Sequence, residues 1–279
     1  MGYAVHVPPG KRVDLSRIDP DADGGLSKVD GTIRADGLTE ELGELQELLY
    51  AAGTHALLIV LQGMDTAGKD GTIRKVLREV NPQGCHVTSF KVPTEEELGH
   101  DFLWRIHKQT PLRGLIGVFN RSHYEDVVVV RVKELVPEPV WRAHYDQINT
   151  FEQLLTASNT LIAKFYLHIS KEEQEGRLLD REKEVEKAWK LSAGDWIERQ
   201  AWDDYIAAYE DALTKCNTDV APWHVIPANR KWFRDVAVAD TLVNLLRPFR
   251  DDWLSSLKAM GQEELKRVKA TRKHLTPNP

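Results

Sequence analysis

Two glycines and a lysine near residue 65 have a spacing that can bind phosphate. Residues 63–69, GMDTAGK, match the pattern G-x-x-x-x-G-K of a phosphate-binding loop. Glycines let backbone N–H groups turn inward around an anion, and a helix that follows presents its positive end to it. Lys69 would add a mobile ammonium group to a phosphate that is being transferred. The alternative is a helix-entry turn that carries a surface lysine.

Two carboxylates set this loop apart from the usual pattern. Asp70 stands where a Ser or Thr hydroxyl usually holds Mg²⁺, and an ordinary ATP-dependent enzyme would rarely lack that hydroxyl. Asp65 lies inside the loop, where its charge would repel phosphate. It is useful there if it faces a metal ion or positions an acceptor. The alternative is an aspartate that bonds the backbone of its own loop.

A second polar segment, NRSHYED, follows a short apolar run. Asn120 occupies the place where phosphate-loop enzymes commonly have an Asp, so a carboxylate must come from Glu125 or Asp126. Arg121 is suited to clamp an anion. Ser122 could instead act only as a helix N-cap, with Glu125 completing its capping box.

A third segment, which begins KEEQEGRLLDREKEVEK, is rich in charge. Arg177 and Arg181 lie four residues apart, so they would share one face of a helix. Lys183 and Lys187 repeat this spacing, and Lys190 follows one turn later. Such a helix is usually a solvated face. Because it follows a strand, it could instead be a lid whose cations close over a polyanion.

The elements that must position these residues follow from the apolar pattern. Short apolar runs alternate with helical periods, which indicates a parallel sheet covered by helices on both faces. The expected strands are residues 56–61, 87–90, 115–119, 161–169 and 224–226. The expected helices are residues 38–49, 69–80, 94–108, 122–131, 141–157, 195–213 and 232–248. Because ligands bind beyond the carboxyl ends of such strands, the polar loops after the first four strands should carry the chemistry.

Composition favours one large globular domain. The chain has 279 residues, of which 42% are hydrophobic and 29% are charged. No apolar stretch reaches the roughly 18 residues of a membrane helix, and the N-terminus lacks the apolar core of a secretory signal. Cys85 and Cys216 form neither a disulfide framework nor a metal pattern, so we expect a cytoplasmic protein. A net charge of −6 argues against nucleic acid as a partner, and any polyanion site must be a local cluster of cations.

Several longer stretches form a distinctive combination. They include LLIVLQGMDTAGKDGTIR, FNRSHYEDVVVVRV, FYLHISKEEQ, WDDYIAAYEDAL and APWHVIPANRKW. Together they resemble the family-2 polyphosphate kinases, and within them the class III subgroup, which accepts both AMP and ADP. The resemblance extends from about Leu38 to Phe249. It implies a fold similar to thymidylate kinase, dependence on Mg²⁺, and direct phosphoryl transfer between polyphosphate and a nucleotide.

The resemblance also implies roles for individual residues. By motif match, residues 63–69 are the phosphate loop and Asp65 is its catalytic carboxylate. Arg121 is the arginine of the second motif, and Arg177 and Arg181 are the arginines of the lid.

Two positions bear on the subgroup and on the lid. Asn120 agrees with the subgroup that accepts AMP and ADP, because other subgroups have Asp there. Glu184-Val185 departs from the family, whose members often have Asp-Pro at this point of the lid. The lid backbone is therefore expected to differ there, although the neighbouring cations remain.

The predicted site is as follows. The catalytic residues are Asp65, Lys69, Arg121, Arg177 and Arg181. The substrate-binding residues are Gly63, Met64, Thr66, Ala67, Gly68, Asp70, Asn120, Lys187 and Lys190. The ligands of the expected cofactor Mg²⁺ are Asp65 and Glu125. The expected substrates and products are inorganic polyphosphate, AMP, ADP and ATP.

The predicted fold is a three-layer α/β/α sandwich with a five-stranded parallel sheet, a phosphate loop and a helical lid. Residues 37–250 would form the phosphotransferase domain, with the lid at about residues 171–200. Residues 1–36 would be an extended arm, and residues 251–279 a C-terminal helix and tail. We also expect a homo-oligomer.

Two other functions use the same features. An ATP-dependent nucleotide or nucleoside kinase would share the fold, but Asp70 and the basic lid argue against it. A non-catalytic polyanion-binding module would need only the cations, but the negative net charge argues against it.

Overall fold

The sheet has six strands. The structure is a computed structural model and describes residues 2–183 and 192–275. The strands are β1 (Val5–His6), β2 (Ala56–Gln62), β3 (Cys85–Ser89), β4 (Ile116–Asn120), β5 (Thr160–His168) and β6 (Trp223–Pro227). Their order across the sheet is β1-β6-β5-β2-β4-β3, and every pair is parallel except β1 with β6. The expectation of five parallel strands is corrected by β1, an antiparallel edge that is too short to show an alternating pattern.

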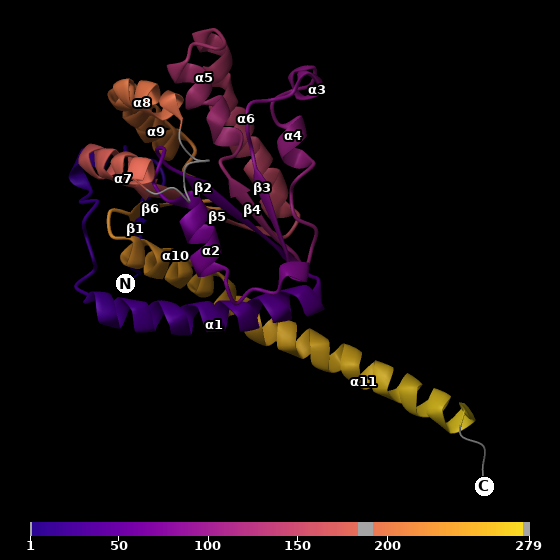
Figure 1. Ribbon diagram of the computed structural model, residues 1–279. Helices are drawn as coiled ribbons and strands as arrows, with labels where there is room; N and C mark the ends of the chain where they lie inside the picture. The colour runs from indigo at the N-terminus through magenta and orange to yellow at the C-terminus, as the bar shows by residue number, and fades with distance from the viewer. Residues whose placement is uncertain (1, 184–191, 276–279) are drawn as a thin grey trace.

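Helices cover both faces of the sheet, as the alternating pattern predicts. All seven residues of β2, at the centre, are buried, because helices lie on either side of it. Figure 1 shows α1 (Lys28–Ala52), α2 (Lys69–Val76) and α10 (Lys231–Leu246) on one side of the sheet. On the other side are α6 (Glu138–Ala157) and α9 (Trp202–Lys215). These layers form an α/β/α arrangement.

α1 begins ten residues before the position that the periodic pattern indicated. Ser27 is its N-cap, and the Ser27 side chain accepts a hydrogen bond from the Asp30 N–H. Gly31 and Gly37 interrupt the apolar repeat in the first turns, so the period becomes visible only at residue 38. The segment expected to be an extended arm, residues 1–36, is therefore helical in its last part.

Three expected helices are each divided into shorter elements. In chain order these are α3 (Glu95–Leu98) with α4 (Trp104–His107), the 3₁₀ helix η3 (His123–Asp126) with α5 (Val129–Val132), and α8 (Ala193–Gln200) with α9. The capping box predicted at Thr94 and Glu97 is present, and Gly99 is the C-cap that ends α3. The breaks place several short turns at the carboxyl edge of the sheet, where loops can converge on a ligand.

The remaining helices lie at the ends of this core. They are the short η1 (Leu15–Arg17), η2 (Pro82–Gly84) and η5 (Arg247–Phe249), and the longer α7 (Lys171–Lys183) and α11 (Arg250–Leu275). α11 extends away from the body (Figure 1). Across residues 2–183 and 192–275, no helix combines the length and the apolar character that crossing a membrane requires.

Candidate active site

The loop between β2 and α2 has the strained backbone of a phosphate cradle. Gly68, the N-cap of α2, has φ +101°, a conformation that residues with a side chain rarely adopt. Gly63 has φ +149°, and a Cβ there would lie 2.8 Å from the Leu167 carbonyl oxygen. Thr66 adopts a left-handed φ of +66° between them. The loop is therefore tight. It leads directly into the start of α2, where backbone N–H groups without helical partners favour an anion.

Lys69 is folded back over this loop. Its side chain is buried, and its Nζ donates to the carbonyl oxygens of Gly63 at 2.7 Å and Met64 at 3.2 Å. Burial, and next the charge of Arg121, lower the pKa of Lys69 to about 8. The ammonium group thus sits at the mouth of the loop, held by bonds that an anion could replace.

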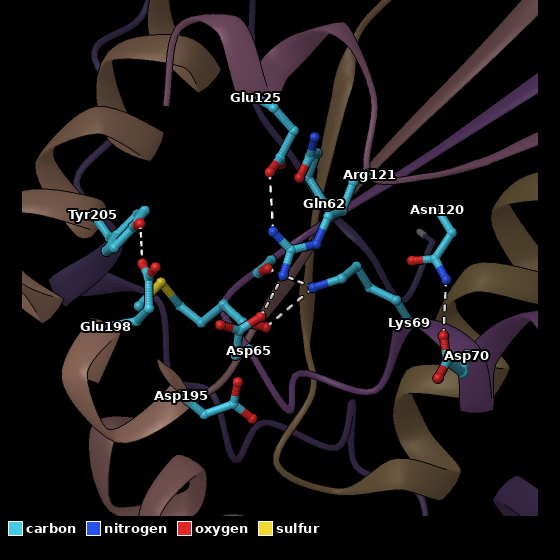
Figure 2. Close-up of polar contacts among 12 residues, drawn as sticks. Gln62, Asp65, Lys69, Asp70, Asn120, Arg121, Glu125, Asp195, Glu198 and Tyr205 are labelled. Carbon is cyan, nitrogen blue, oxygen red and sulfur yellow. Dashed lines mark hydrogen bonds and ion pairs between the residues drawn. The ribbon is translucent and has the colours of Figure 1, made fainter. Parts of the chain in front are cut away.

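Arg121 joins the phosphate loop to the end of β4 (Figure 2). Its Nη2 donates to Asp65 Oδ1 at 2.6 Å, and its Nη1 donates to Glu125 Oε2 at 3.0 Å. Burial alone would lower the pKa of the guanidinium, but the carboxylates of Glu125 and Asp65 raise it above its ordinary value. Arg121 has φ +62°, so the turn is held in a costly conformation in order to aim this side chain.

The two residues that depart from the usual motifs contact each other. The Asn120 amide Nδ2 donates to Asp70 Oδ1 at 2.8 Å (Figure 2). Asp70 thus bridges from the start of α2 to the end of β4, beside Lys69. The pair therefore ties the start of α2 to the end of β4.

A buried polar network anchors η3, the turn that follows Arg121. Lys164 on β5 and Glu152 on α6 form an ion pair of 2.6 Å, with both side chains at most 1% exposed. The Tyr124 hydroxyl donates to Glu152 Oε1 at 2.7 Å and accepts from Lys164 Nζ at 2.8 Å. Ser122 is the N-cap of η3, as predicted, but the Glu125 carboxylate turns to Arg121 and does not complete a capping box. The sequence motifs did not predict this network.

Arg177 lies behind the phosphate loop. It is 8% exposed, and its Nη1 donates to the carbonyl oxygens of Thr66 and Ala67 at 2.9 and 3.1 Å. Its Nη2 donates to the carbonyl oxygens of Ala228 and Asn229, and its Nε donates to the Glu173 carboxylate. Since all three guanidinium nitrogens bond protein oxygens, the geometry is that of a brace between the loop and the segment after β6.

Arg234, which the sequence did not single out, approaches the same loop from α10. It is 3% exposed, and its Nη1 lies 2.0 Å from the place where a Cβ of Gly68 would be. Asp235 accepts from its Nη2 at 2.6 Å. In the sequence, the only feature that could have indicated this contact is that Arg234 lies within a largely apolar helix. Gly68 is thus needed for two reasons, its backbone angle and the close approach of this guanidinium.

Helices α7 and α8, which fall within the expected lid, border one side of the site. Arg181 on α7 donates to Asp195 on α8 at 3.0 Å. Burial and the nearby charge of Asp65 raise the pKa of Asp195. The predictions made for Lys187, Lys190 and Glu184-Val185 concern positions outside the residues that the structure describes.

A cavity of about 220 Å³ opens between the loop and the lid. Its lining contains residues of the loop and of the lid, and also side chains that the sequence did not indicate: Lys133, Gln174, Glu198, Tyr205 and Tyr209. A larger cavity, of about 690 Å³, lies at the opposite, amino edge of β5. It is lined by none of the predicted site residues, so the smaller cavity is the candidate active site.

The carboxylates of the site fit the ligand preference of Mg²⁺. In proteins Mg²⁺ is usually held by one or two carboxylates together with substrate phosphates and water. Asp65 and Glu125 converge on the same guanidinium, so both carboxylates already share one cationic position. Within the described ranges there is no cluster of three or more His, Cys, Asp or Glu side chains that could hold a metal without a substrate.

Comparison with known proteins gives a consistent result. The solved structure of Polyphosphate Kinase 2 from Arthrobacter aurescens TC1 superposes with a TM-score of 0.85 at 44% identity, covering 88% of each chain. An AMP/ADP-polyphosphate phosphotransferase of Meiothermus ruber is 50% identical over 86% of this chain and 91% of its own length.

A second curated relative is named for a narrower acceptor range. An ADP-polyphosphate phosphotransferase of Rhodopseudomonas palustris is 45% identical over 81% of this chain and 82% of its own. The family model described as Polyphosphate kinase 2 (PPK2) matches residues 25–250, which contain the loop at residues 63–69, Arg121 after β4, and Arg177 and Arg181 on α7. The chain therefore belongs to the polyphosphate kinase 2 family.

Proposed function

We propose that the protein transfers the terminal phosphoryl group of inorganic polyphosphate to AMP and to ADP, giving ADP and ATP. The observation that carries this proposal is the convergence of Lys69, Arg121, Asp65 and Glu125 at the mouth of one phosphate loop. The choice of both nucleotides is supported by the name of the Meiothermus ruber relative. Asn120, paired with Asp70, agrees with that choice.

Phosphoryl transfer needs alignment and charge neutralisation more than covalent help. An oxygen of the acceptor phosphate attacks the terminal phosphorus of polyphosphate, and the P–O bond to the next phosphate breaks. The shortened polymer leaves with the negative charge on its new end. The acceptor oxygen is already ionised, so the step needs no protein nucleophile or general base.

Each side chain of the loop has a distinct part in this step. Lys69 would exchange its bonds to the Gly63 and Met64 carbonyl oxygens for donor phosphate oxygens. Arg121 would follow the transferring group from the other side. Asp65 and Glu125 would hold Mg²⁺, which when bound neutralises charge on the phosphate oxygens. The backbone N–H groups of residues 63–68 and the start of α2 would cradle the donor.

The lid would complete the site when substrate binds. Arg181 pairs with Asp195 in the structure, so a polyanion would compete with that carboxylate for the guanidinium. Arg177 would act through the loop that it braces. Lys187 and Lys190 remain predicted contacts of polyphosphate, along the same lid. A cytoplasmic location stays a prediction, in keeping with the two free cysteines.

The test is to incubate the protein with polyphosphate, Mg²⁺ and AMP and to resolve the nucleotides by chromatography. ADP should appear first and ATP second. If ADP alone is an acceptor, the proposed acceptor range is wrong. If ATP is a good donor and polyphosphate is inert, the protein is an ATP-dependent nucleotide kinase. Salt-sensitive polyanion binding without turnover would indicate a non-catalytic binding module.

A further inference from the structure

The segment that precedes α1, residues 2–27, contacts the carboxyl ends of two strands of the sheet. This segment, here called the arm, is the indigo trace that leads to α1 in Figure 1. The Ile18 carbonyl oxygen accepts a hydrogen bond from Nε2 of His168, the last residue of β5, at 3.1 Å. The Pro20 carbonyl oxygen accepts from the N–H of Asn229, just after β6, at 3.1 Å. The family match begins at residue 25, so nearly all of the arm lies outside the matched part of the chain.

Asn229 uses all of its polar groups at this contact. Besides its N–H bond to the Pro20 carbonyl oxygen, its Nδ2 donates to Asp21 Oδ2 at 2.9 Å. Its Oδ1 accepts from the N–H of Ser170, the residue before α7, at 3.0 Å. Its carbonyl oxygen accepts from Arg177 Nη2 at 2.9 Å. Asn229 therefore joins the arm, the start of α7 and the guanidinium of Arg177.

A second contact holds the chain one residue later. Arg230 Nη1 donates to Asp23 Oδ2 at 2.7 Å, and Asp23 Oδ1 accepts from the Gly25 N–H at 3.0 Å. An exposed ion pair of this kind contributes little to stability, but it limits where the chain can lie. The segment after β6 is thus fixed from outside by two consecutive contacts with the arm.

Arg177 carries this contact to the phosphate loop. Its Nη2 is bound by the carbonyl oxygens of Ala228 and Asn229, and its Nη1 donates to the Ala67 carbonyl oxygen at 3.1 Å. Because the guanidinium is planar, a shift at Nη2 also moves Nη1. The Ala67 carbonyl and the Gly68 N–H belong to one peptide plane, so Arg177 also sets the direction of that N–H. The Gly68 N–H is one of the groups that would cradle the donor phosphate.

We propose that Asn229, held by Asp21 of the arm, is a positioning residue that orients the phosphate loop for the polyphosphate donor. The inference rests on the proposed function, because it assigns the donor to this loop. A misplacement of about 1 Å can lower a rate by about a hundredfold, whereas one exposed hydrogen bond contributes only about 1 kcal/mol to stability. Loss of the bond between Asp21 and Asn229 should therefore affect turnover more than folding.

The experiment reverses the two partners of this hydrogen bond. In Asn229→Asp two carboxylates face each other, so kcat with AMP and polyphosphate should fall by about tenfold. The KM for polyphosphate should rise by about threefold, while the KM for AMP should stay within about twofold, because the loop holds the donor. Adding Asp21→Asn pairs an amide with a carboxylate again, in the opposite direction. This swapped variant should recover a kcat within about twofold of the parent.

A matched control separates the bond from an effect of charge. Asn229→Asp combined with Asp14→Asn has the same net charge as the swapped variant, but Asp14 caps η1 elsewhere on the arm. Its kcat should stay at the level of Asn229→Asp. Thermal melts should place all the variants within about 4 °C of the parent, because only an exposed bond is changed.

Hydrogen exchange of the amides at residues 63–69, followed by mass spectrometry, reports on the loop without turnover. Exchange should be faster in Asn229→Asp and should return to the parent rate in the swapped variant. Unchanged exchange and kcat in Asn229→Asp would overturn the proposal, and so would a control that recovers as fully as the swapped variant. If the exchange rates follow the expected pattern but the parent transfers no phosphoryl group, the link from the arm to the loop stands and the proposed function is wrong.

Discussion

At the scale of residues, the two cations of the phosphate loop have pKa values that their surroundings shift. Burial lowers the pKa of Lys69, whereas the pKa of Arg121 is raised by the carboxylates of Glu125 and Asp65 against the effect of burial. Lys69 reaches the mouth of the loop from the first position of α2, and Arg121 reaches it from the end of β4. Each is held by oxygen atoms of the protein that a phosphate could replace. Their contributions can therefore be separated from folding by substitutions that keep the loop backbone.

Replacing Lys69 by Ala should lower kcat by about a thousandfold, equivalent to about 4 kcal/mol of transition-state stabilisation. The reason is that its ammonium group can follow the transferring phosphoryl group. The melting temperature should fall only modestly, because the substitution removes two hydrogen bonds to the Gly63 and Met64 carbonyl oxygens. Steady-state kinetics and a thermal melt check both points, and a folded Lys69→Ala protein with more than a tenth of the activity would refute the role.

The pH dependence should reveal the same lysine. Because its pKa is lowered to about 8, Lys69 loses its proton as the pH rises through about 8, well below the range of a solvated lysine. The kcat/KM for polyphosphate should therefore fall above that pH. In a Lys69→Arg variant the remaining activity should lack this decline, since an arginine stays charged. A parent protein with a flat profile to pH 9.5 would contradict the assignment.

Arg177 and Arg121 should respond differently to the same substitution. Arg177→Lys removes several hydrogen bonds from a buried brace, so the free energy of unfolding should fall by about 3 kcal/mol. Arg121→Lys should lower kcat with a smaller effect on the melting temperature, because its guanidinium is partly exposed. Denaturant unfolding and kinetics of both variants check this, and equal effects on stability would contradict the difference in role.

At the scale of elements, strand and loop order were predictable where apolar runs end in polar loops. β2, β4, β5 and β6 and the loop at residues 63–69 follow from such runs. The two-residue β1 and the early start of α1 could not be predicted, because neither segment has a sustained repeat of apolar residues. The Lys164–Glu152 network depends on contacts between residues far apart in the chain, which spacing alone does not encode.

The phosphate loop offers a matched pair of glycine substitutions. In Gly68→Ala, the alanine would have to adopt φ +101°, and its Cβ would lie 2.0 Å from Arg234. The free energy of unfolding should therefore fall by more than about 2 kcal/mol, and most of the activity should be lost. Gly71→Ala lies in α2, with its nearest neighbour at 3.4 Å, and should leave both nearly unchanged. Thermal melts and steady-state kinetics of both variants test this. Equal melting temperatures and equal kcat values would show that the loop backbone at Gly68 is not strained.

At the scale of the molecule, the positive charge of the site is a local cluster on a protein that is negatively charged overall. The protein is acidic overall, while Lys69, Arg121, Arg177 and Arg181 gather around one loop and a lid at the carboxyl edge of the sheet. The outer part of α11, residues 258–275, is also basic but lies away from them (Figure 1). Polyphosphate should therefore be attracted to one edge of the molecule, and added salt should weaken its binding.

Phosphoryl transfer from polyphosphate to the nucleotide is the central claim, and a labelled donor tests it most directly. The protein would be incubated with polyphosphate labelled with phosphorus-32, unlabelled AMP and Mg²⁺, and the products would be resolved by thin-layer chromatography. Label should enter the β position of ADP and then both outer positions of ATP, with little labelled inorganic phosphate. Label that appears only as inorganic phosphate, with AMP unchanged, would contradict phosphoryl transfer by this site.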